Sequence, residues 1–282
     1  LKYGNQKSRT LTTKRINQIN TSYLVQYFYE IITIQSDKKE KNTYKFFLLI
    51  SQDLLNNFAS NDYASFLLNL ASLYIDGLKF DTNFMKARIY SEISAKLKNS
   101  EAFVVLGNFY LGGLGVEQDY SRARIYYELA AKQNNSNAYL NLGVIYSHGL
   151  GVEQNSKKAI KYYKLSASLN NKDAFYNLGI LYEEGQGVEP NYLKAIKYFE
   201  LAAEQRNSNA FVHLALFYEE GLGVKQDFSI TMKYYNLAAE LNNPDALFNL
   251  AVIYEKGQIV EQNYLKAKEY YELSLKQDKS NI

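Results

Sequence analysis

The sequence contains no cysteine and no tryptophan, and it has only two prolines and two histidines among its 282 residues. The lack of cysteine excludes disulfide bonds, thiolate metal sites and a cysteine nucleophile. The scarcity of proline is typical of an almost wholly helical chain, because proline disrupts helix interiors. No apolar run reaches the ~18 residues that a helix needs to cross a bilayer.

An excess of charge of one sign is also missing. The chain carries 32 Lys and Arg against 29 Asp and Glu, which gives a net charge of +3. This balance argues against a protein that grips the phosphates of nucleic acid, since such proteins usually have a strong basic excess. The absence of disulfides favours a reducing compartment, and we expect a cytoplasmic protein. The chain opens on Leu1 and not on methionine, so we expect a processed product or a fragment.

What the sequence does contain is a repeat with a fixed period. Five alanines follow one another at intervals of 36 residues: Ala102, Ala138, Ala174, Ala210 and Ala246. Each alanine is followed along the chain by the same pattern. It consists of a leucine, a tyrosine, a loop glycine, two adjacent aromatic residues and a pair of small residues. A fixed period of this length is typical of a solenoid, in which each repeat is one supersecondary unit.

The unit 136–171 shows how one repeat is expected to fold. Its first helix is predicted from Ser136 to His148, and its second helix follows a short loop. Four residues of the first helix lie three or four positions apart and share one face: Ala138, Leu142, Ile145 and Tyr146. This face is predicted to pack on the second helix. Gly143 lacks a side chain and should allow close approach of that partner.

Residues that start and stop helices recur at the expected boundaries. The loop glycines that should take the left-handed conformation are Gly113, Gly149, Gly185 and Gly221. The residues predicted to cap the second helices are Asp119, Asn155, Asn191, Asp227 and Asn263. Glycine ends a helix without steric cost, and each cap contributes ~1 kcal/mol. The predicted left-handed stops after the second helices are Asn134, Asn170 and Asn242.

The period divides the chain into three parts. Residues 62–276 are predicted to form the solenoid, and 277–282 a tail. Residues 1–61 are predicted to form a basic arm and then two helices, 16–34 and 44–58, that either cap the solenoid or end an upstream domain. The first unit, 64–99, departs from the pattern, as terminal repeats commonly do: Phe66 replaces the anchor alanine, and Lys79 and Phe80 replace the loop Gly-Val.

The full pattern, A-x-x-x-L-G-x-x-Y-x-x-G-x-G-V-x-x-D-Y-x-x-A-x-x-Y-Y-x-x-A-A, resembles the Sel-1-like repeat, a relative of the tetratricopeptide repeat. The resemblance covers about 64–276, or six units. It is specific, because tetratricopeptide units are about 34 residues long and lack the Gly-x-Gly-Val loop. The resemblance implies an all-α fold, a right-handed α-solenoid of helix-turn-helix repeats. It also implies a scaffold that brings other proteins together. Members that bridge their helices with disulfides differ from this chain, which has no cysteine.

Nothing in the sequence indicates an active site. His148 and His213 lie in different repeats, and neither has a partner at metal-ligand spacing. Ser36 and Lys39 match a Ser-x-x-Lys motif, but the other penicillin-binding motifs are missing. The repeated Gly-x-Gly lacks the preceding strand of a phosphate-binding loop. We therefore predict no catalytic residue, no metal and no cofactor, and we keep a β-lactamase-like hydrolase only as an alternative.

The side of the first helices that faces away from the second helices is the predicted partner site. An apolar row contains Val104, Leu140, Tyr176, Val212 and Phe248, and a second row contains Asn108, Val144, Ile180, Leu216 and Val252. A polar column contains Asn69, Asn141, Asn177, His213 and Asn249, and an acidic edge contains Glu183, Glu184, Glu219, Glu220 and Glu255. Such a groove suits a peptide with apolar anchors and basic residues.

Two alternatives stay open for this surface. Neighbouring first helices could fill the apolar rows and leave no groove. The chain could also be an RNA-binding helical array, although such arrays need a basic groove with base-reading polar pairs. The lysines at 157, 158, 161 and 164 are predicted to form an ordinary solvated helix face.

Overall fold

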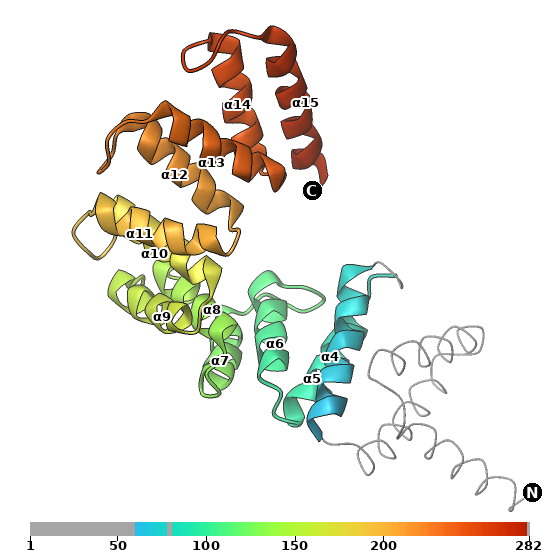
Figure 1. The fold of residues 1–282 in the computed structure, drawn as a ribbon. Helices are drawn as coiled ribbons and strands as arrows, with labels where there is room; N and C mark the ends of the chain where they lie inside the picture. The colour runs from blue at the N-terminus through green and yellow to red at the C-terminus, as the bar shows by residue number, and fades with distance from the viewer. Residues whose placement is uncertain (1–59, 78–80, 281–282) are drawn as a thin grey trace, which may run out of the picture. The chain divides into compact units, whose positions relative to one another are not determined.

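The computed structural model describes residues 60–77 and 81–280 (Figure 1). The predictions made for 1–59, including both N-terminal helices and the Ser-x-x-Lys motif, lie outside the described residues. The substitutions predicted at Lys79 and Phe80 lie outside them as well.

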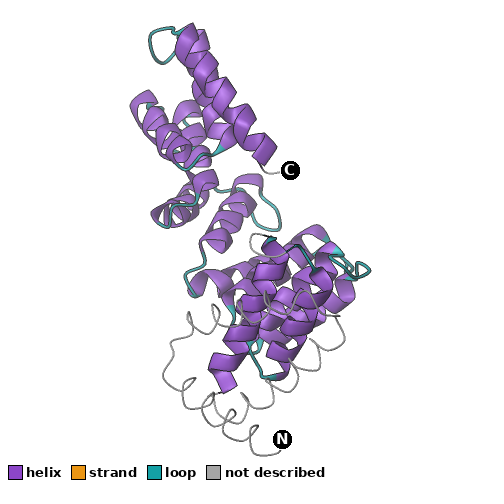
Figure 2. Ribbon diagram, turned by 90° about the vertical axis from the view of Figure 1, so that its right-hand side faces the viewer, coloured by secondary structure: helices purple, strands orange, loops and turns teal. Residues whose placement is uncertain are grey.

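The described residues form helices joined by short loops and contain no strand (Figure 2). The first helices of the repeats, called A helices here, are α4 (Ser60–Asp76), α6 (Ser100–Gly112), α8 (Ser136–His148), α10 (Lys172–Glu184), α12 (Ser208–Glu220) and α14 (Pro244–Lys256). The second or B helices are α5 (Phe84–Lys96), α7 (Tyr120–Ala131), α9 (Ser156–Ser168), α11 (Tyr192–Glu204), α13 (Phe228–Glu240) and α15 (Tyr264–Ser280). The predicted all-α solenoid of six helix pairs is confirmed.

The chain divides into two compact units, Leu1–Asn135 and Ser136–Ile282. The first unit contains α4 to α7, and each of these helices packs on the next. The second contains α8 to α15, which also pack in chain order. Helix α15 continues through Ser280 into the segment predicted as a tail. No helix of the described residues is long and apolar enough to cross a membrane.

Helix boundaries follow the capping residues that the sequence predicts. Asn155 Oδ1 accepts a hydrogen bond from the Lys158 amide at 2.9 Å, and the other four predicted B-helix caps make the same kind of bond. Gly185, at φ 72°, ends α10 in the left-handed conformation. The stops at Asn134, Asn170 and Asn242 are also left-handed, with φ between 55° and 60°. Residues at the helix ends therefore determine where each helix begins and ends, through capping side chains and left-handed backbone conformations.

Each repeat buries the predicted face of its A helix against its B helix. In 136–171, the buried residues include all four predicted ones, Ala138, Leu142, Ile145 and Tyr146. Gly143 lies beneath the ring of Tyr163 on α9, and a Cβ at this position would come within 2.4 Å of that ring. An aromatic side chain of the B helix therefore occupies the space that the glycine leaves.

A ladder of asparagines at the N-termini of the A helices joins neighbouring repeats. Asn171 caps α10 through Oδ1, which accepts from the amides of Asp173 and Ala174 at 3.0 and 3.1 Å. Its Nδ2 donates to Asn137 Oδ1 of the preceding repeat at 3.1 Å. Asn207 and Asn243 repeat this double role, donating to residues 173 and 209. One side chain thus caps a helix and links two repeats, a feature that the sequence analysis missed.

Candidate partner-binding surface

The A-helix surface is defined here by the predicted site residues, which all lie on α8, α10, α12 and α14: Leu140, Asn141, Tyr176, Asn177, Glu183, Glu184, Val212, His213, Glu219, Glu220, Phe248 and Asn249. The prediction that this face turns away from the B helices is wrong in part, because Tyr176 meets Phe199 of α11 and Phe248 meets Tyr271 of α15.

The first apolar row of the A-helix surface is not uniformly exposed. Phe248 is 51% exposed, whereas Val212 is 8% exposed and packs in the core with Ala215 and Leu250. Leu140 and Tyr176 are partly buried. The prediction of a continuous exposed row is wrong at Val212, because the neighbouring helices fill that space.

The second row and the polar column are also mostly recessed. All of the second-row residues in this unit are partly buried: Val144, Ile180, Leu216 and Val252. The same is true of the polar column: Asn141, Asn177, His213 and Asn249. The surface therefore offers shallow apolar contacts and single exposed anchors, and not a deep apolar floor.

The acidic edge contains carboxylates that are bonded to B-helix tyrosines and carboxylates that are exposed to solvent. Glu219 Oε2 accepts from the Tyr235 hydroxyl at 2.9 Å, and Glu255 Oε2 accepts from Tyr271 at 2.7 Å. Burial and then the charge of Glu219 raise the pKa of Tyr235, so its hydroxyl stays protonated as a donor. Glu184 and Glu220 are exposed, and Glu184 Oε2 accepts a hydrogen bond from Gln186 Nε2. These exposed carboxylates are the ones that a partner in solution can reach.

Glu183 differs from its counterparts because its repeat has no such tyrosine. Position 199 is phenylalanine, and the imidazole of His213 stacks on that ring at 4.7 Å with an interplanar angle of 16°. His213 Nδ1 lies 3.0 Å from Glu183 Oε2, and His213 Nε2 lies 3.3 Å from the Tyr176 hydroxyl. His213 of α12 therefore contacts two side chains of α10, although neither its Nδ1 nor Glu183 Oε2 makes a hydrogen bond in the structure. The sequence analysis placed His213 in the polar column and missed these contacts.

Tyr176 lies among carboxylates from two helices. Burial raises the pKa of its hydroxyl, and the negative charges of Glu183, Asp245 and Glu184 raise it further. Asp245 belongs to α14 and acts on Tyr176 of α10, although α12 lies between them in the chain order of A helices.

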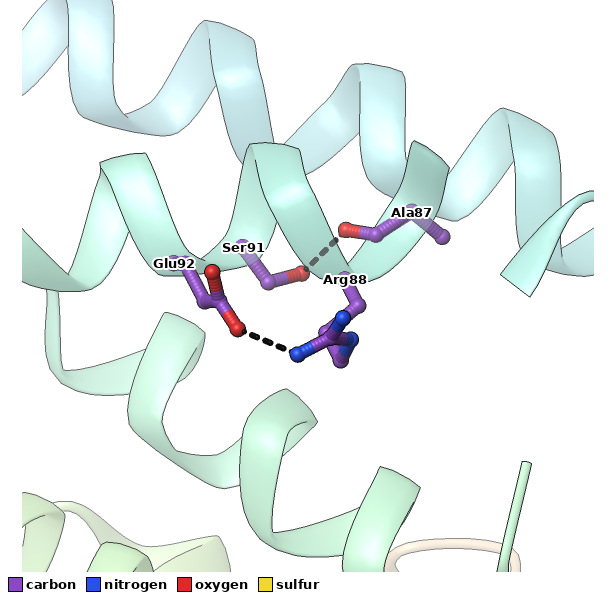
Figure 3. Close-up of polar contacts among 4 residues, drawn as sticks. All are labelled: Ala87, Arg88, Ser91 and Glu92. Atoms are coloured by element: carbon purple, nitrogen blue, oxygen red, sulfur yellow. Dashed lines mark hydrogen bonds and ion pairs between the residues drawn. The ribbon is translucent and has the colours of Figure 1, made fainter. Parts of the chain in front are cut away.

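Charged pairs of the first unit are local to its B helices. Arg88 Nη1 lies 2.8 Å from Glu92 Oε1 within α5, beside the hydrogen bond from Ser91 Oγ to the Ala87 carbonyl (Figure 3). Arg124 and Glu128 repeat the pair one period later at 2.9 Å. Pairs of this spacing stabilise a helix by ~0.3–0.5 kcal/mol. They support the fold and do not converge on a site.

The described residues do not assemble a metal centre: they contain no group of three His, Cys, Asp or Glu side chains able to hold an ion. The other histidine, His148, is exposed at the end of α8, where Nδ1 lies 3.1 Å from the Val144 carbonyl of the same helix. The A-helix surface can therefore offer hydrogen bonds, negative charge and apolar anchors, which are the chemistry of recognition.

Comparison with known proteins agrees with this description. The Sel1 repeat model matches residues 64–99, 104–135, 136–171, 173–207, 212–243 and 244–279. No curated protein matches the chain.

Solved structures give the same fold. The protective antigen c5321 of uropathogenic Escherichia coli, which displays an SLR fold, is 31% identical with a TM-score of 0.65, over 76% of this chain and 46% of that one. This chain therefore spans about half the length of c5321. A Sel1 repeat protein of Oxalobacter formigenes is 23% identical with a TM-score of 0.72, over 80% and 98% of the two chains. The immunity protein Pa5087 of Pseudomonas aeruginosa is 20% identical with a TM-score of 0.56, over 76% and 82%.

The proteins from Oxalobacter and Pseudomonas share only 23% and 20% of their residues with this chain, so their similarity to it shows the fold alone. Sel1 repeat proteins are in general helical scaffolds without catalytic activity, and their repeats mediate protein interactions. Six matched repeats cover most of the sequence and coincide with the six helix pairs of the structure. The chain belongs to the Sel1 repeat family.

Proposed function

We propose that this chain is a non-catalytic adaptor that binds a peptide or protein segment along the A-helix surface of α10, α12 and α14. The observation that carries the proposal is an exposed aromatic side chain on a surface with exposed carboxylates. Phe248 is 51% exposed, and Asp245 precedes it by one helical turn on the same face of α14. An exposed aromatic residue is the kind of side chain on which binding energy concentrates.

Charge indicates the chemistry of the partner. Helices α10, α12 and α14 together carry seven carboxylates against two lysines. A negative surface attracts a positive segment and speeds its association. The acidic character also counts against RNA, whose phosphates would be repelled. A segment with apolar anchors and basic residues therefore suits this surface best.

Selection from a displayed peptide library on the purified chain, followed by titration of the selected peptide, tests the proposal. We expect enrichment of peptides that combine Arg or Lys with an aromatic or aliphatic anchor. Phe248→Ala and the double variant Glu184→Lys, Glu220→Lys should weaken binding, and the charge reversal should act mainly by slowing association.

Leu193→Ala is the matched control, because Leu193 is 68% exposed on the B helix α11. It should leave the affinity unchanged. If Leu193→Ala weakened binding and the A-helix variants did not, the partner site would lie on the other face.

A further inference from the structure

In the part of the chain that the structure describes, five of the six repeats place a cation over an aromatic ring. A Lys or Arg near the start of the B helix lies 4.9 to 5.4 Å from the ring centre of an A-helix tyrosine, within the range of a cation–π contact. The pairs are Lys86 on Tyr74, Arg122 on Tyr110, Lys158 on Tyr146, Lys194 on Tyr182 and Lys266 on Tyr254. The repeat 208–243 has the tyrosine, Tyr218, but Ile230 takes the place of the cation.

The repeat 100–135 shows what an arginine contacts at this position. Arg122 Cζ lies 5.4 Å from the centre of the Tyr110 ring, and Arg122 Nε lies 3.2 Å from Oδ2 of Asp119, the cap of the same helix. The other oxygen, Asp119 Oδ1, accepts from the Arg122 amide. The guanidinium therefore contacts an aromatic ring and a carboxylate at once.

Tyr218 and Asp227 reproduce this arrangement without the arginine. They lie three periods of the repeat beyond Tyr110 and Asp119. Asp227 Oδ1 caps α13 and accepts from the Ile230 amide at 3.1 Å, and the carboxylate has no ion pair among the residues that the structure describes. Ile230 is uncharged and shorter than arginine, so it cannot supply that contact. Tyr218 is only partly buried and Asp227 is exposed, so both can be reached from solvent.

Two more aromatic rings and a second carboxylate lie near Tyr218. The ring centre of Tyr234 on α13 is 6.0 Å from that of Tyr218 and 6.1 Å from that of Phe211. Burial raises the pKa of Tyr234, and the charges of Tyr218 and Glu200 raise it further. Glu200 is exposed on α11. Aromatic faces and negative charge both attract a cation.

Glu200 also lacks the partner of its counterpart. Three periods earlier, Glu92 Oε1 lies 2.8 Å from Arg88 Nη1 (Figure 3). The position of that arginine is taken by Ile196 in the later repeat. The surroundings of Tyr218 therefore have the carboxylates of the earlier repeat but neither of its two arginines.

We propose a binding site for an arginine side chain of a partner protein, in which the guanidinium takes the position that Arg122 fills in its own repeat. The site, called the arginine site here, consists of Tyr218, Tyr234, Asp227 and Glu200. A guanidinium suits it better than an ammonium, because its planar group stacks on aromatic rings and binds carboxylates through two hydrogen bonds. None of the four residues belongs to the A-helix surface, so the inference goes beyond the proposed function.

A blocked Gly-Arg-Gly tripeptide, titrated into the chain with carbon-13-labelled tyrosine, tests the inference by NMR. Tyr218→Phe and Tyr234→Phe identify the signals of the two rings. We expect saturable shifts of both signals with the arginine tripeptide. The same tripeptide with citrulline should bind at least roughly threefold more weakly, because neutral citrulline forms no cation–π contact.

Ile230→Arg supplies the cation from the chain itself and should abolish the shifts, since the new guanidinium would fill the site. Asn236→Arg is the matched control, because it adds the same charge at an exposed position of α13, and it should leave the shifts in place. The double variant Glu200→Gln, Asp227→Asn retains a good helix cap and should weaken binding roughly threefold to tenfold.

Two results would overturn the inference: shifts that persist in Ile230→Arg, or equal affinity for the arginine and citrulline tripeptides. Either result would leave the proposed function standing, because the A-helix surface is tested by its own variants. Conversely, a selected peptide whose affinity is insensitive to Phe248→Ala and to the charge reversal would contradict the proposed function and leave the arginine site unaffected.

Discussion

Gly149 shows how a single residue can control the shape of one repeat. Its φ is 68°, in the left-handed region that a side chain disfavours. A Cβ at this position would lie 3.2 Å from both the Gln154 amide nitrogen and the Val152 carbonyl oxygen. Both neighbours are backbone atoms of the same loop, so they cannot move away independently.

We therefore expect Gly149→Val to lower the free energy of unfolding by ~1–2 kcal/mol or more. Lys161→Ala on the exposed face of α9 is the control and should stay within ~0.5 kcal/mol. Urea denaturation followed by circular dichroism gives both values. Equal shifts of the two midpoints would show that the loop tolerates a side chain.

Tyr176 and Phe248 occupy equivalent positions, yet the structure separates their roles. Tyr176 is partly buried, and its ring lies 5.8 Å from Phe199 and 5.6 Å from the imidazole of His213. Phe248 is mostly in contact with solvent and meets Tyr271 edge-on at 5.6 Å. Removing these two rings should therefore have unequal effects on stability.

We expect Tyr176→Ala to destabilise the chain by about 2 kcal/mol or more through lost packing, and Phe248→Ala by under ~1 kcal/mol. Urea midpoints of the two single variants test this difference. Similar losses for both would mean that Phe248 is packed like Tyr176 and is not a free anchor.

At the scale of the helix, the A-helix caps have more contacts than the B-helix caps. Asn207 caps α12 through Oδ1 and donates to Asp173 of the preceding repeat at 3.0 Å. Asn155 caps α9 through Oδ1 and bonds the Lys158 amide. The A-helix asparagines are thus part of the interface between repeats.

Asn207→Ala should cost more than Asn155→Ala for this reason. We expect ~1 kcal/mol for Asn155, as for an ordinary cap, and a further ~1 kcal/mol for Asn207, because its substitution also removes the bond to the preceding repeat. Thermal and urea unfolding of the two variants supply the comparison. A smaller loss at Asn207 than at Asn155 would show that the link between repeats contributes nothing measurable.

At the scale of the whole molecule, the aromatic residues of the repeats give the array a predictable response to alkaline pH. Burial raises the pKa of the phenols of Tyr127, Tyr163 and Tyr235, which lie beneath the A helices of their repeats. In the unfolded chain, these phenols would titrate near the ordinary value of about 10. Because the native state holds these protons more tightly than the unfolded state, stability is complete below that pH and falls as the pH rises above it.

We expect the helical circular dichroism signal to be lost cooperatively above pH ~10. Tyrosinate absorbance should rise in two phases, first from exposed tyrosines and then together with the loss of helix. Tyr235→Phe should shift the second phase to higher pH if the variant remains folded, since it removes one of the linked groups. A single phase of absorbance with the helices intact would contradict the assignment of buried phenols.

Much of this protein follows from the sequence because its constraints are local. The period, the helix boundaries, the left-handed glycines and the B-helix caps depend on residues a few positions apart, and each repeat restates them. Gly143 and Asn155 could therefore be assigned from the pattern of one repeat. The family resemblance follows from the same positions, and the six repeats are confirmed.

The features that depend on contacts between neighbouring repeats were determined only by the tertiary structure. Val212 and Phe248 share a position in the pattern, but Val212 is covered by neighbouring helices and Phe248 is exposed. The bond from Asn207 to residue 173 and the contact of His213 with Glu183 each join two repeats. The sequence contains these residues but not their distances, because packing between repeats sets which side chains meet. The A-helix surface as a binding site stays a prediction, and its chemistry is a product of that packing.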